Sequence, residues 1–546
     1  MVMFQKLEKD LKKISYAKIN KSILLTSFFL ISFLNAQVNQ KFEIFDWEII
    51  GKKSSVNSIT EGYKYIYFAT YVNGILRYNK FSRSFDESLY LGQGLISKKI
   101  KHVYFDKSTS ILWSVGDMAL EFSSSRVGNW NNVNYSKLSL NSYNDIIDIG
   151  SSLNFIWIKT SSGYIKLDHI NGSFLGIFLF PDEKKIFWGD SNFKYDIFFK
   201  EIDFENYFVE EGWLLSQNFA IDSNGISVKY ISTLKTENGH SWIGLTNGYI
   251  MLVDSFSKTI KPINFGFDTA IPITISFKKE AWLAGIRDKK LSSVTSISED
   301  FNEIRNFSEL NYSNFFNGDF FSSKIIDNEV WFGSTGAVLI YNKEKDFFRT
   351  LGYEKDIPVG RIYFIENLRN SILIGSKKDL VIIDKLTKKR VNSTISNFVK
   401  KNNTYIDDLE MDKDNIYLIS DNKLYQFDMN ENINFSKLND KFKFISVFVT
   451  NEIKYFVTNK GIINSENDSI IPSSLYFNYQ INDIVEFKDY IFIGTNKGLI
   501  VYDNKYNRLD DFYNFSFLEN IYDMEQIGKY LVLLSNSGLI KLNLQL

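Results

Sequence analysis

The stretch Tyr490–Asp503, which reads YIFIGTNKGLIVYD, decides the fold. β-branched and aromatic residues fill its first half, Asn496-Lys497-Gly498 interrupts it, and a second apolar run follows. Two such runs joined by a short glycine-containing turn predict a β-hairpin, because glycine adopts positive φ without a steric penalty. The same pattern recurs as YIYFATYVNGILRYN from Tyr65, SWIGLTNGYIMLVD from Ser241 and YLVLLSNSGLIKLN from Tyr530.

Glycine occupies the expected turn centre of the clearest copies. We assign structural turn glycines at Gly74, Gly163, Gly248, Gly336, Gly461, Gly498 and Gly538. A further strand precedes the hairpin, as in IKHVYFD from Ile100, and a fourth lies in the more variable connection. Four strands in a period of about 40–45 residues predict one propeller blade. Helical repeats have similar lengths, but short β-branched segments broken by glycine disfavour helix.

The number of repeats predicts two rings. We expect an all-β chain of tandem β-propellers, with about 12 four-stranded blades, because a single ring holds roughly four to eight. Two rings of six or seven blades are the expected solution, with the first propeller over residues 37–300 and the second over 301–546. A strand from the segment Phe42–Ile50 is one way in which a ring could close.

The N-terminal 36 residues have the pattern of a secretory signal peptide. Six lysines precede the apolar run ILLTSFFLISFL from Ile23 to Leu34, and Ala36 precedes the polar Gln37. The run spans about 12 residues, whereas a membrane-crossing helix needs about 20. We therefore predict cleavage between Ala36 and Gln37 and an exported protein that is periplasmic, outer-membrane-associated or secreted. We expect no transmembrane segment in the mature chain.

Composition excludes several kinds of site. The chain has no cysteine, only three histidines (His102, His169 and His240), and a formal net charge of -1. Thiolate chemistry and cysteine-ligated metals are thereby excluded, and a broad nucleic-acid surface is disfavoured. The run Asp412–Asn415 lacks the remaining ligands of a calcium loop and falls where the repeat places a turn. We predict no catalytic residue, no metal ligand and no cofactor, and the sequence identifies no ligand-binding residue.

The repeat resembles that of a known family. Gly94-Leu95 followed by IKHVYFD and Leu112-Trp113-Ser114, and Ser241–Gly244 followed by Asn247-Gly248, are similar to the propeller repeat in the ligand-binding sensor domains of hybrid two-component regulators. A weaker resemblance is to the two-propeller protein of the type IX secretion system. Both resemblances imply propeller architecture, because the shared residues build the blade rather than a site.

Three functions remain open at this point. The first is a non-enzymatic exported binding protein that recognises a glycan, peptide or protein partner as a sensor-like module. The second is a scaffold in an envelope secretion or assembly machine. The third is a propeller lyase or glycosidase, which would need two carboxyl groups about 5–10 Å apart. We favour the first, because no catalytic motif is recognisable.

Overall fold

We describe a computed structural model, which covers residues 41–123, 129–189, 204–223, 225–236, 239–287, 291–301, 303–310, 312, 314–352, 356–435, 440–466, 469–476 and 478–544. The predicted signal peptide and its cleavage site at Ala36 and Gln37 lie outside these residues. β-strands are the dominant secondary structure of the described part of the chain, and they form eleven sheets. The predicted all-β, tandem-propeller fold is confirmed.

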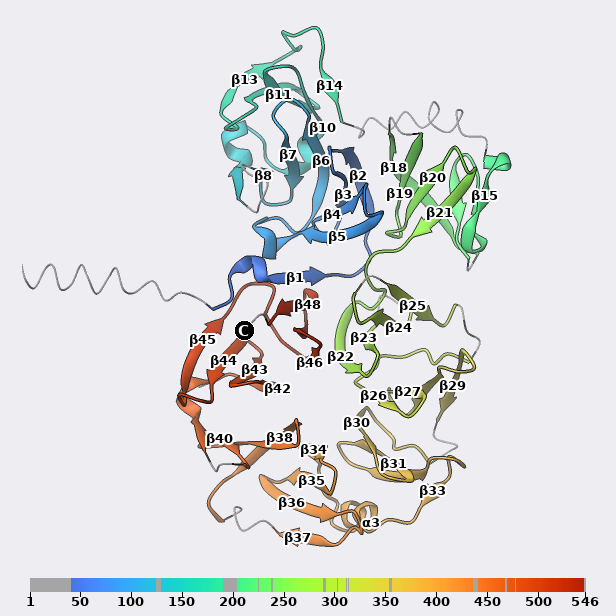
Figure 1. Cartoon of the computed structure of the whole chain (residues 1–546), viewed down its shortest axis with the longest axis vertical. Coiled ribbons are helices and arrows are strands. Elements are labelled where there is room, and N and C mark those ends of the chain that lie inside the picture. Colours follow the sequence, from blue (N-terminus) through green and yellow to red (C-terminus); the bar gives the residue numbers. More distant parts are fainter. Residues whose placement is uncertain are drawn as a thin grey trace, which may run out of the picture. The chain divides into compact units, whose positions relative to one another are not determined.

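Seven sheets form the second propeller (Figure 1). Six of them, each given from the inner to the outer strand, are β22 (Ile271–Phe277), β23 (Glu280–Ile286), β24 (Ser293–Ser298) and β25 (Ile304–Ser308); β26 (Ser322–Ile326), β27 (Glu329–Gly333), β28 (Val338–Asn342) and β29 (Phe347–Leu351); β30 (Ile362–Asn367), β31 (Ser371–Ser376), β32 (Leu380–Asp384) and β33 (Arg390–Val391); β34 (Asp408–Met411), β35 (Asn415–Ser420), β36 (Lys423–Asp428) and β37 (Ile433–Phe435); β38 (Phe444–Thr450), β39 (Ile453–Thr458), β40 (Gly461–Asn464) and β41 (Ile470–Pro472); β42 (Ile481–Phe487), β43 (Tyr490–Thr495), β44 (Gly498–Asp503) and β45 (Arg508–Tyr513).

The seventh sheet closes this ring with a strand from the other end of the chain. It consists of β46 (Asp523–Ile527), β47 (Tyr530–Ser535), β48 (Gly538–Asn543) and, as the outermost strand, β1 (Trp47–Ile50). In Figure 1 the blue β1 lies beside the red β48, with Trp47 opposite Leu542. Inner strands β22, β26, β30, β34, β38, β42 and β46 contact one another in that order, and β46 contacts β22. The alternative closure by the segment 42–50 is thereby confirmed.

Four sheets form the described part of the first propeller. They are β2 (Val56–Glu61), β3 (Tyr65–Thr70), β4 (Ile75–Asn79) and β5 (Ser84–Leu89); β6 (Ile100–Asp106), β7 (Ile111–Gly116), β8 (Leu120–Ser123) and β9 (Trp130–Val133); β10 (Ile146–Ser151), β11 (Phe155–Thr160), β12 (Gly163–Asp168), β13 (Phe174–Phe178) and β14 (Phe187–Trp188); β15 (Phe208–Val209), β16 (Leu214–Leu215), β17 (Phe219–Ile221), β18 (Ser227–Lys235), β19 (His240–Leu245), β20 (Ile250–Asp254) and β21 (Thr259–Ile263). Inner strand β18 contacts β2, β2 contacts β6, and β6 contacts β10. Among described residues this propeller has fewer sheets than the six or seven expected.

Helices are short. The α-helix α3 (Thr394–Lys401) follows β33, and the side chain of Ser393 caps it by accepting the N–H of Ser396. The 3-10 helices are η1 (Ile44–Asp46), η2 (Leu91–Gln93), η3 (Tyr135–Leu138), η4 (Tyr143–Asp145), η5 (Phe204–Asn206), η6 (Glu210–Gly212) and η9 (Ser473–Leu475). No helix in the described ranges is long and apolar enough to cross a bilayer.

The predicted boundary between the propellers is wrong. Residues 300 and 301 fall between β24 and β25, which belong to one sheet of the second propeller. The chain enters the second propeller with β1, builds the first, and returns at β22, so the first propeller is inserted between two strands of the second. The connections 51–55 and 264–270 run together: the N–H of Lys53 donates to the Phe267 carbonyl at 2.9 Å, and the Lys53 ammonium pairs with Asp268 at 2.7 Å.

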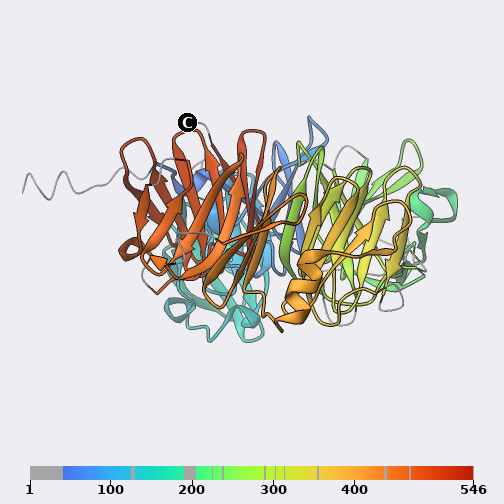
Figure 2. The same ribbon diagram turned by 90° about the horizontal axis from the view of Figure 1, so that it is seen from below.

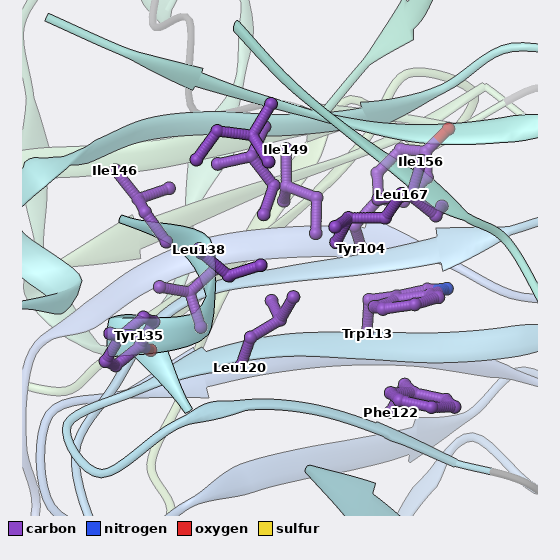
Figure 3. Close-up of a cluster of buried hydrophobic side chains, with 13 residues drawn as sticks. Tyr104, Trp113, Leu120, Phe122, Tyr135, Leu138, Ile146, Ile149, Ile156 and Leu167 are labelled. Carbon is purple, nitrogen blue, oxygen red and sulfur yellow. The ribbon is translucent and has the colours of Figure 1, made fainter. Parts of the chain in front are cut away.

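Apolar side chains between neighbouring sheets form the core. In one cluster (Figure 3), Trp113 of β7 stacks on Phe122 of β8 with ring centroids 4.5 Å apart, and Leu138 and Ile146 lie toward the next sheet. Both Trp113 and Leu138 are fully buried. Figure 2 shows the sheets from the side, with turns at both ends of the strands. A blade therefore buries its two faces only against its neighbours.

All seven predicted turn glycines have positive φ, from +62° at Gly74 to +154° at Gly461. Four are not turn centres but the first residues of β12, β40, β44 and β48. Gly498 pairs with Thr495, whose hydroxyl donates to its carbonyl at 2.8 Å, so Asn496 and Lys497 form the turn. A Cβ at Gly498 would lie 2.2 Å from the carbonyl oxygen of Tyr513 in the outer strand. Glycine is therefore required there by φ and by the approach of β45.

Candidate functional site

A cleft of about 800 Å³ lies beside the outer strands of both propellers. Its walls are strands β4, β5, β20 and β21 of the first propeller and β1, β25 and β48 of the second. Binding sites for small ligands commonly have volumes of about 300–1,000 Å³. The site exists because β1 and the connection 264–270 bring outer strands of separate repeats together.

Aromatic rings line one side of the cleft. The rings of Phe85 and Phe265 lie 5.2 Å apart between centroids, and Tyr78 lies 5.4 Å from Phe85. Tyr78 in turn packs edge-on against the buried Trp242 at 4.7 Å. The rings are therefore fixed by the core of the first propeller, and their partly buried members Phe85 and Phe265 give the cleft an apolar lining.

Charged groups from both propellers also line the cleft. Lys541 pairs with Glu48, and its ammonium also lies 4.8 Å from the centroid of the Phe301 ring. The Arg77 guanidinium donates to the Glu87 carbonyl at 2.6 Å. Partial burial in the cleft, together with the nearby Glu48 carboxylate, raises the pKa of Glu87. Both signs of charge are thus present within one cleft.

Three polar groups in the cleft have capacity for a ligand. The side-chain oxygen of Asn264 is buried and accepts no hydrogen bond in the described structure. Arg83 and Lys261 are exposed and form no ion pair with any described residue. Because a buried acceptor without a donor is costly, a ligand that donates a hydrogen bond to Asn264 would gain binding energy.

The axis of the second propeller is a second candidate. The inner strands carry Glu366, Glu410 and Glu525, and Lys324 is their one cation among the described residues. Lys324 lies 2.9 Å from Glu366 and keeps 39% of its side-chain surface exposed. The carboxylates of Glu366, Glu410 and Glu525 raise the pKa of Lys324, although burial opposes them. These groups from four different blades therefore act on one another around the axis.

Burial dominates the titration of the axial acids. Burial, followed by repulsion from Glu366, raises the pKa of Glu410 well above its ordinary value. Burial and repulsion from Asp483 raise the pKa of Glu525 to about 7. Burial also raises the pKa of Asp523 to about 7 and that of Asp408 to about 6. Burial therefore shifts the protonation of these carboxyl groups to a higher pH than is usual for Asp and Glu.

The axial aspartates also connect the blades. The carboxylate of Asp408 accepts a hydrogen bond from the backbone N–H of Val447 at 2.9 Å. Asp483 accepts the N–H of Met524 at 2.6 Å in the same way, and Asp523 accepts the N–H of Ile275 at 2.8 Å. Each bond runs from one inner strand to the inner strand of the next blade. These oxygens are therefore engaged with backbone, which favours a structural role for them over general acid or base chemistry.

The sequence did not identify either site. The axial acids have a weak signature, an acid at alternate positions of an apolar strand, as in Asp408-Leu409-Glu410 and Asp523-Met524-Glu525. The cleft has none, because its residues come from five separate segments of the chain that belong to four different sheets. The three histidines lie apart: His102 is buried on β6, His169 faces Asp106 at 3.5 Å, and His240 faces Asp254 at 3.6 Å.

Asp412–Asn415 forms a turn, as the repeat indicates. One carboxylate oxygen of Asp412 accepts the N–H groups of Asp414 and Asn415 at 2.8 Å and 2.7 Å. The other accepts the Tyr417 hydroxyl at 2.8 Å. The described residues contain no group of three or more acidic or histidine side chains arranged to hold a metal ion.

The sequence matches no protein-family model and no curated protein. Among solved structures, the extracellular domain of the hybrid two-component system protein BT4673 from B. thetaiotaomicron is similar, with 12% identity, 90% of this chain and 70% of that chain covered, and a TM-score of 0.42. The corresponding domain of BT3049 has 15% identity, coverage of 88% and 74%, and a TM-score of 0.37. PorZ of the type IX secretion system of Porphyromonas gingivalis has 9% identity, coverage of 91% and 87%, and a TM-score of 0.34.

These structures belong to the two groups that the repeat resembles. At such identities and TM-scores the likeness supports no conclusion about this chain. A function for this chain has to be argued from its own residues.

Proposed function

We propose that this chain is an exported, non-enzymatic β-propeller protein that binds a glycan, peptide or protein segment in the cleft beside β5 and β21. The observation that carries the proposal is the cleft itself, which combines fixed aromatic faces, both signs of charge and the unsatisfied oxygen of Asn264. Rigid rings beside a few convergent polar groups are typical of recognition sites. The export rests on the N-terminal sequence pattern.

The engagement of the axial aspartates and of Glu48 favours a binding role over an enzymatic one, although Glu87 in the cleft has a raised pKa. The axial aspartates accept backbone N–H groups from neighbouring blades, and Glu48 in the cleft is paired with Lys541. A lyase or glycosidase would need carboxyl groups free to exchange protons with a substrate. The alternative is a scaffold role in an envelope secretion or assembly machine.

Ligand screening with matched variants tests this function. Oligosaccharide and peptide panels are screened by thermal shift, and any hit is titrated by calorimetry against wild type, Lys261→Ala and Asn264→Ala. Each variant should weaken binding by about tenfold, because one polar contact contributes roughly 1–1.5 kcal/mol. Lys229→Ala, an exposed lysine on β18 that does not line the cleft, should have no effect. Equal binding by all variants would refute the cleft as the site.

A further inference from the structure

The outer strand β13 exposes an unusual set of side chains (Figure 1). Phe174, Leu175 and Ile177 of this strand are 42%, 48% and 54% exposed. Leu179 and Phe180, which follow the strand directly, are 78% and 80% exposed. We call these five residues the β13 surface. They lie within a run of seven positions, so they form one apolar strip along the edge of their sheet.

No other outer strand in the described part of the chain has a comparable strip. Each of the others carries at most one exposed large apolar side chain, and these are Phe208 of β15, Phe347 of β29, Val391 of β33, Ile470 of β41 and Leu509 of β45. The other outer strands of five or more residues, β5, β25, β29 and β45, each contain a charged residue, whereas the run from Ile170 to Pro181 contains none. Charged residues on an edge strand commonly prevent contact between sheet edges. The strand β13 lacks this protection.

The backbone that carries the β13 surface is fixed by its own sheet. One edge of β13 pairs with β12. Directly after the strip, Asp182 pairs with Lys166 at 2.8 Å, and the Trp157 indole N–H donates to Glu183 at 2.8 Å. The apolar side chains therefore stay in water on an ordered strand, at a hydrophobic cost that a partner surface would remove.

The area of the strip is sufficient for a weak specific contact. The exposed fractions of the five residues are together equivalent to about three fully exposed large side chains. At roughly 200 Å² for each side chain, one copy offers about 600 Å². Two copies in contact would bury about 1,200 Å² in total, which is the lower end of the range for specific protein interfaces.

We propose that the β13 surface joins two copies of this chain about a two-fold axis. In such a contact the same strip lies on both partners, so an uncharged strip meets an uncharged strip and no charge is buried without a partner. Asp182 and Glu183, next to the strip, are already engaged within their own sheet. A glycan would need polar side chains that the strip lacks. The proposal does not depend on the cleft, because none of the five residues lines it.

Sedimentation equilibrium of the purified protein over about 1–100 µM tests the proposal. A reversible equilibrium between monomer and dimer should fit the data, with a dissociation constant on the order of micromolar, because the contact area is small. Raised salt should not weaken the dimer, since the contact contains no ion pair. The proposal is overturned if the protein is monomeric over the whole range. It is also overturned if larger assemblies grow with concentration, because a two-fold contact is closed.

Variants of the β13 surface locate the contact. Leu179→Ser with Phe180→Ser should raise the dissociation constant about tenfold or more, because both copies lose apolar area. The matched control is Phe81→Ser with Phe256→Ser, since these phenylalanines are 78% and 83% exposed on turns of other sheets. The control should dimerise like wild type, and all variants should keep the circular-dichroism spectrum of wild type. Equal losses in the two variants, or no loss in either, would place the contact elsewhere and overturn the proposal.

An engineered cysteine reports on the two-fold axis, because the natural chain has none. Ile177→Cys places a thiol in the middle of the strip, and a short bis-maleimide should join two copies at micromolar protein. Leu386→Cys, on an exposed turn of the second propeller, should remain uncrosslinked under the same conditions. Equal crosslinking of both variants, or none at Ile177→Cys, contradicts the two-fold contact. A monomeric protein that floats with phosphatidylcholine vesicles through Leu179 and Phe180 would instead assign the strip to a lipid surface and overturn the proposal.

Discussion

The two propellers join their inner strands by partly different chemistry. In the second, carboxylates of Asp408, Asp483 and Asp523 accept N–H groups from the next blade. One neutral bond acts beside them, in which the Ser322 hydroxyl donates to the Ile362 carbonyl at 2.9 Å. In the first propeller, neutral side chains link neighbouring inner strands. The Ser232 hydroxyl donates to the Val56 carbonyl at 2.6 Å, and the Asn57 amide donates to the Ile100 carbonyl at 2.9 Å. The comparison shows that inner strands of neighbouring blades can be linked by titratable carboxylates or by neutral side chains.

They also differ in how their sheets are completed. The second propeller is closed by β1, which joins the first described strand to the last. The first is connected to it through two chain segments that run together, so its insertion leaves the closing strand in place. Closure of the second propeller should therefore depend on a strand that is distant in sequence, and that dependence can be measured.

Removal of the closing contact should have the largest effect. Trp47 on β1 is fully buried, and its ring lies 5.5 Å from Tyr513 and 5.9 Å from Phe517. Trp47→Ala should lower the unfolding free energy of the second propeller by about 3–5 kcal/mol, the usual effect of deleting a buried large side chain. Urea unfolding followed by far-ultraviolet circular dichroism measures the loss.

The control is a tryptophan on an outer strand that closes nothing. Trp130 on β9 is only partly buried, and Trp130→Ala should lower the unfolding free energy by about 1 kcal/mol. If both substitutions had equal effects, β1 would be an ordinary outer strand and the proposed dependence on closure would be wrong.

Acidification should affect the strands around two buried sites, one in each propeller, in opposite directions. Burial lowers the pKa of His102 in the first propeller to about 4 from 6.5, so the unfolded chain binds more protons between these pH values. The contribution of His102 to stability should fall as the pH drops through that window, by on the order of 3 kcal/mol at the acid end. In the second propeller burial raises the pKa of Asp523 and Glu525 to about 7, so the folded state binds more protons and is stabilised as the pH falls from about 7 toward 4.

Hydrogen exchange separates the two responses. Amide protection factors are measured at pH 7 and pH 5 and corrected for intrinsic exchange rates. On going from pH 7 to pH 5, protection of the peptide that contains β6 should decrease, and protection of the peptide that contains β46 should increase. Asp523→Asn should flatten the change at β46 and leave that at β6 unaltered. A decrease at both strands would show that the axial acids of the second propeller do not titrate as their burial indicates.

The repeat allowed the fold to be predicted because its signal is local. Each hairpin, such as Tyr490–Asp503, carries its own strands and its own glycine, and neither needs information from elsewhere in the chain. The propeller boundary was not predictable in this way, since β24 and β25 resemble the end of any blade. Only the pairing of Trp47 with Leu542 shows which ring the strand β1 completes. The cleft depends on that long-range pairing, so local patterns could not reveal it.

A pair of equivalent glycines gives the smallest expected difference between the propellers. Gly498 and Gly163 have φ of +145° and +150°, and a Cβ would lie 2.2 Å from the Tyr513 carbonyl oxygen or 2.6 Å from that of Phe178. Tyr513 is fixed against Trp47 in the closed ring, whereas Phe178 ends β13, whose side chains are largely exposed.

Gly498→Ala should therefore lower the unfolding free energy by about 2–3 kcal/mol, and Gly163→Ala by about 1 kcal/mol, because β13 can shift away from the new methyl group. Urea unfolding of the two variants beside wild type measures the difference. Equal losses of unfolding free energy would mean that the positive φ alone determines the destabilisation. The outer strands β13 and β45 would then move away from the new methyl group to the same extent.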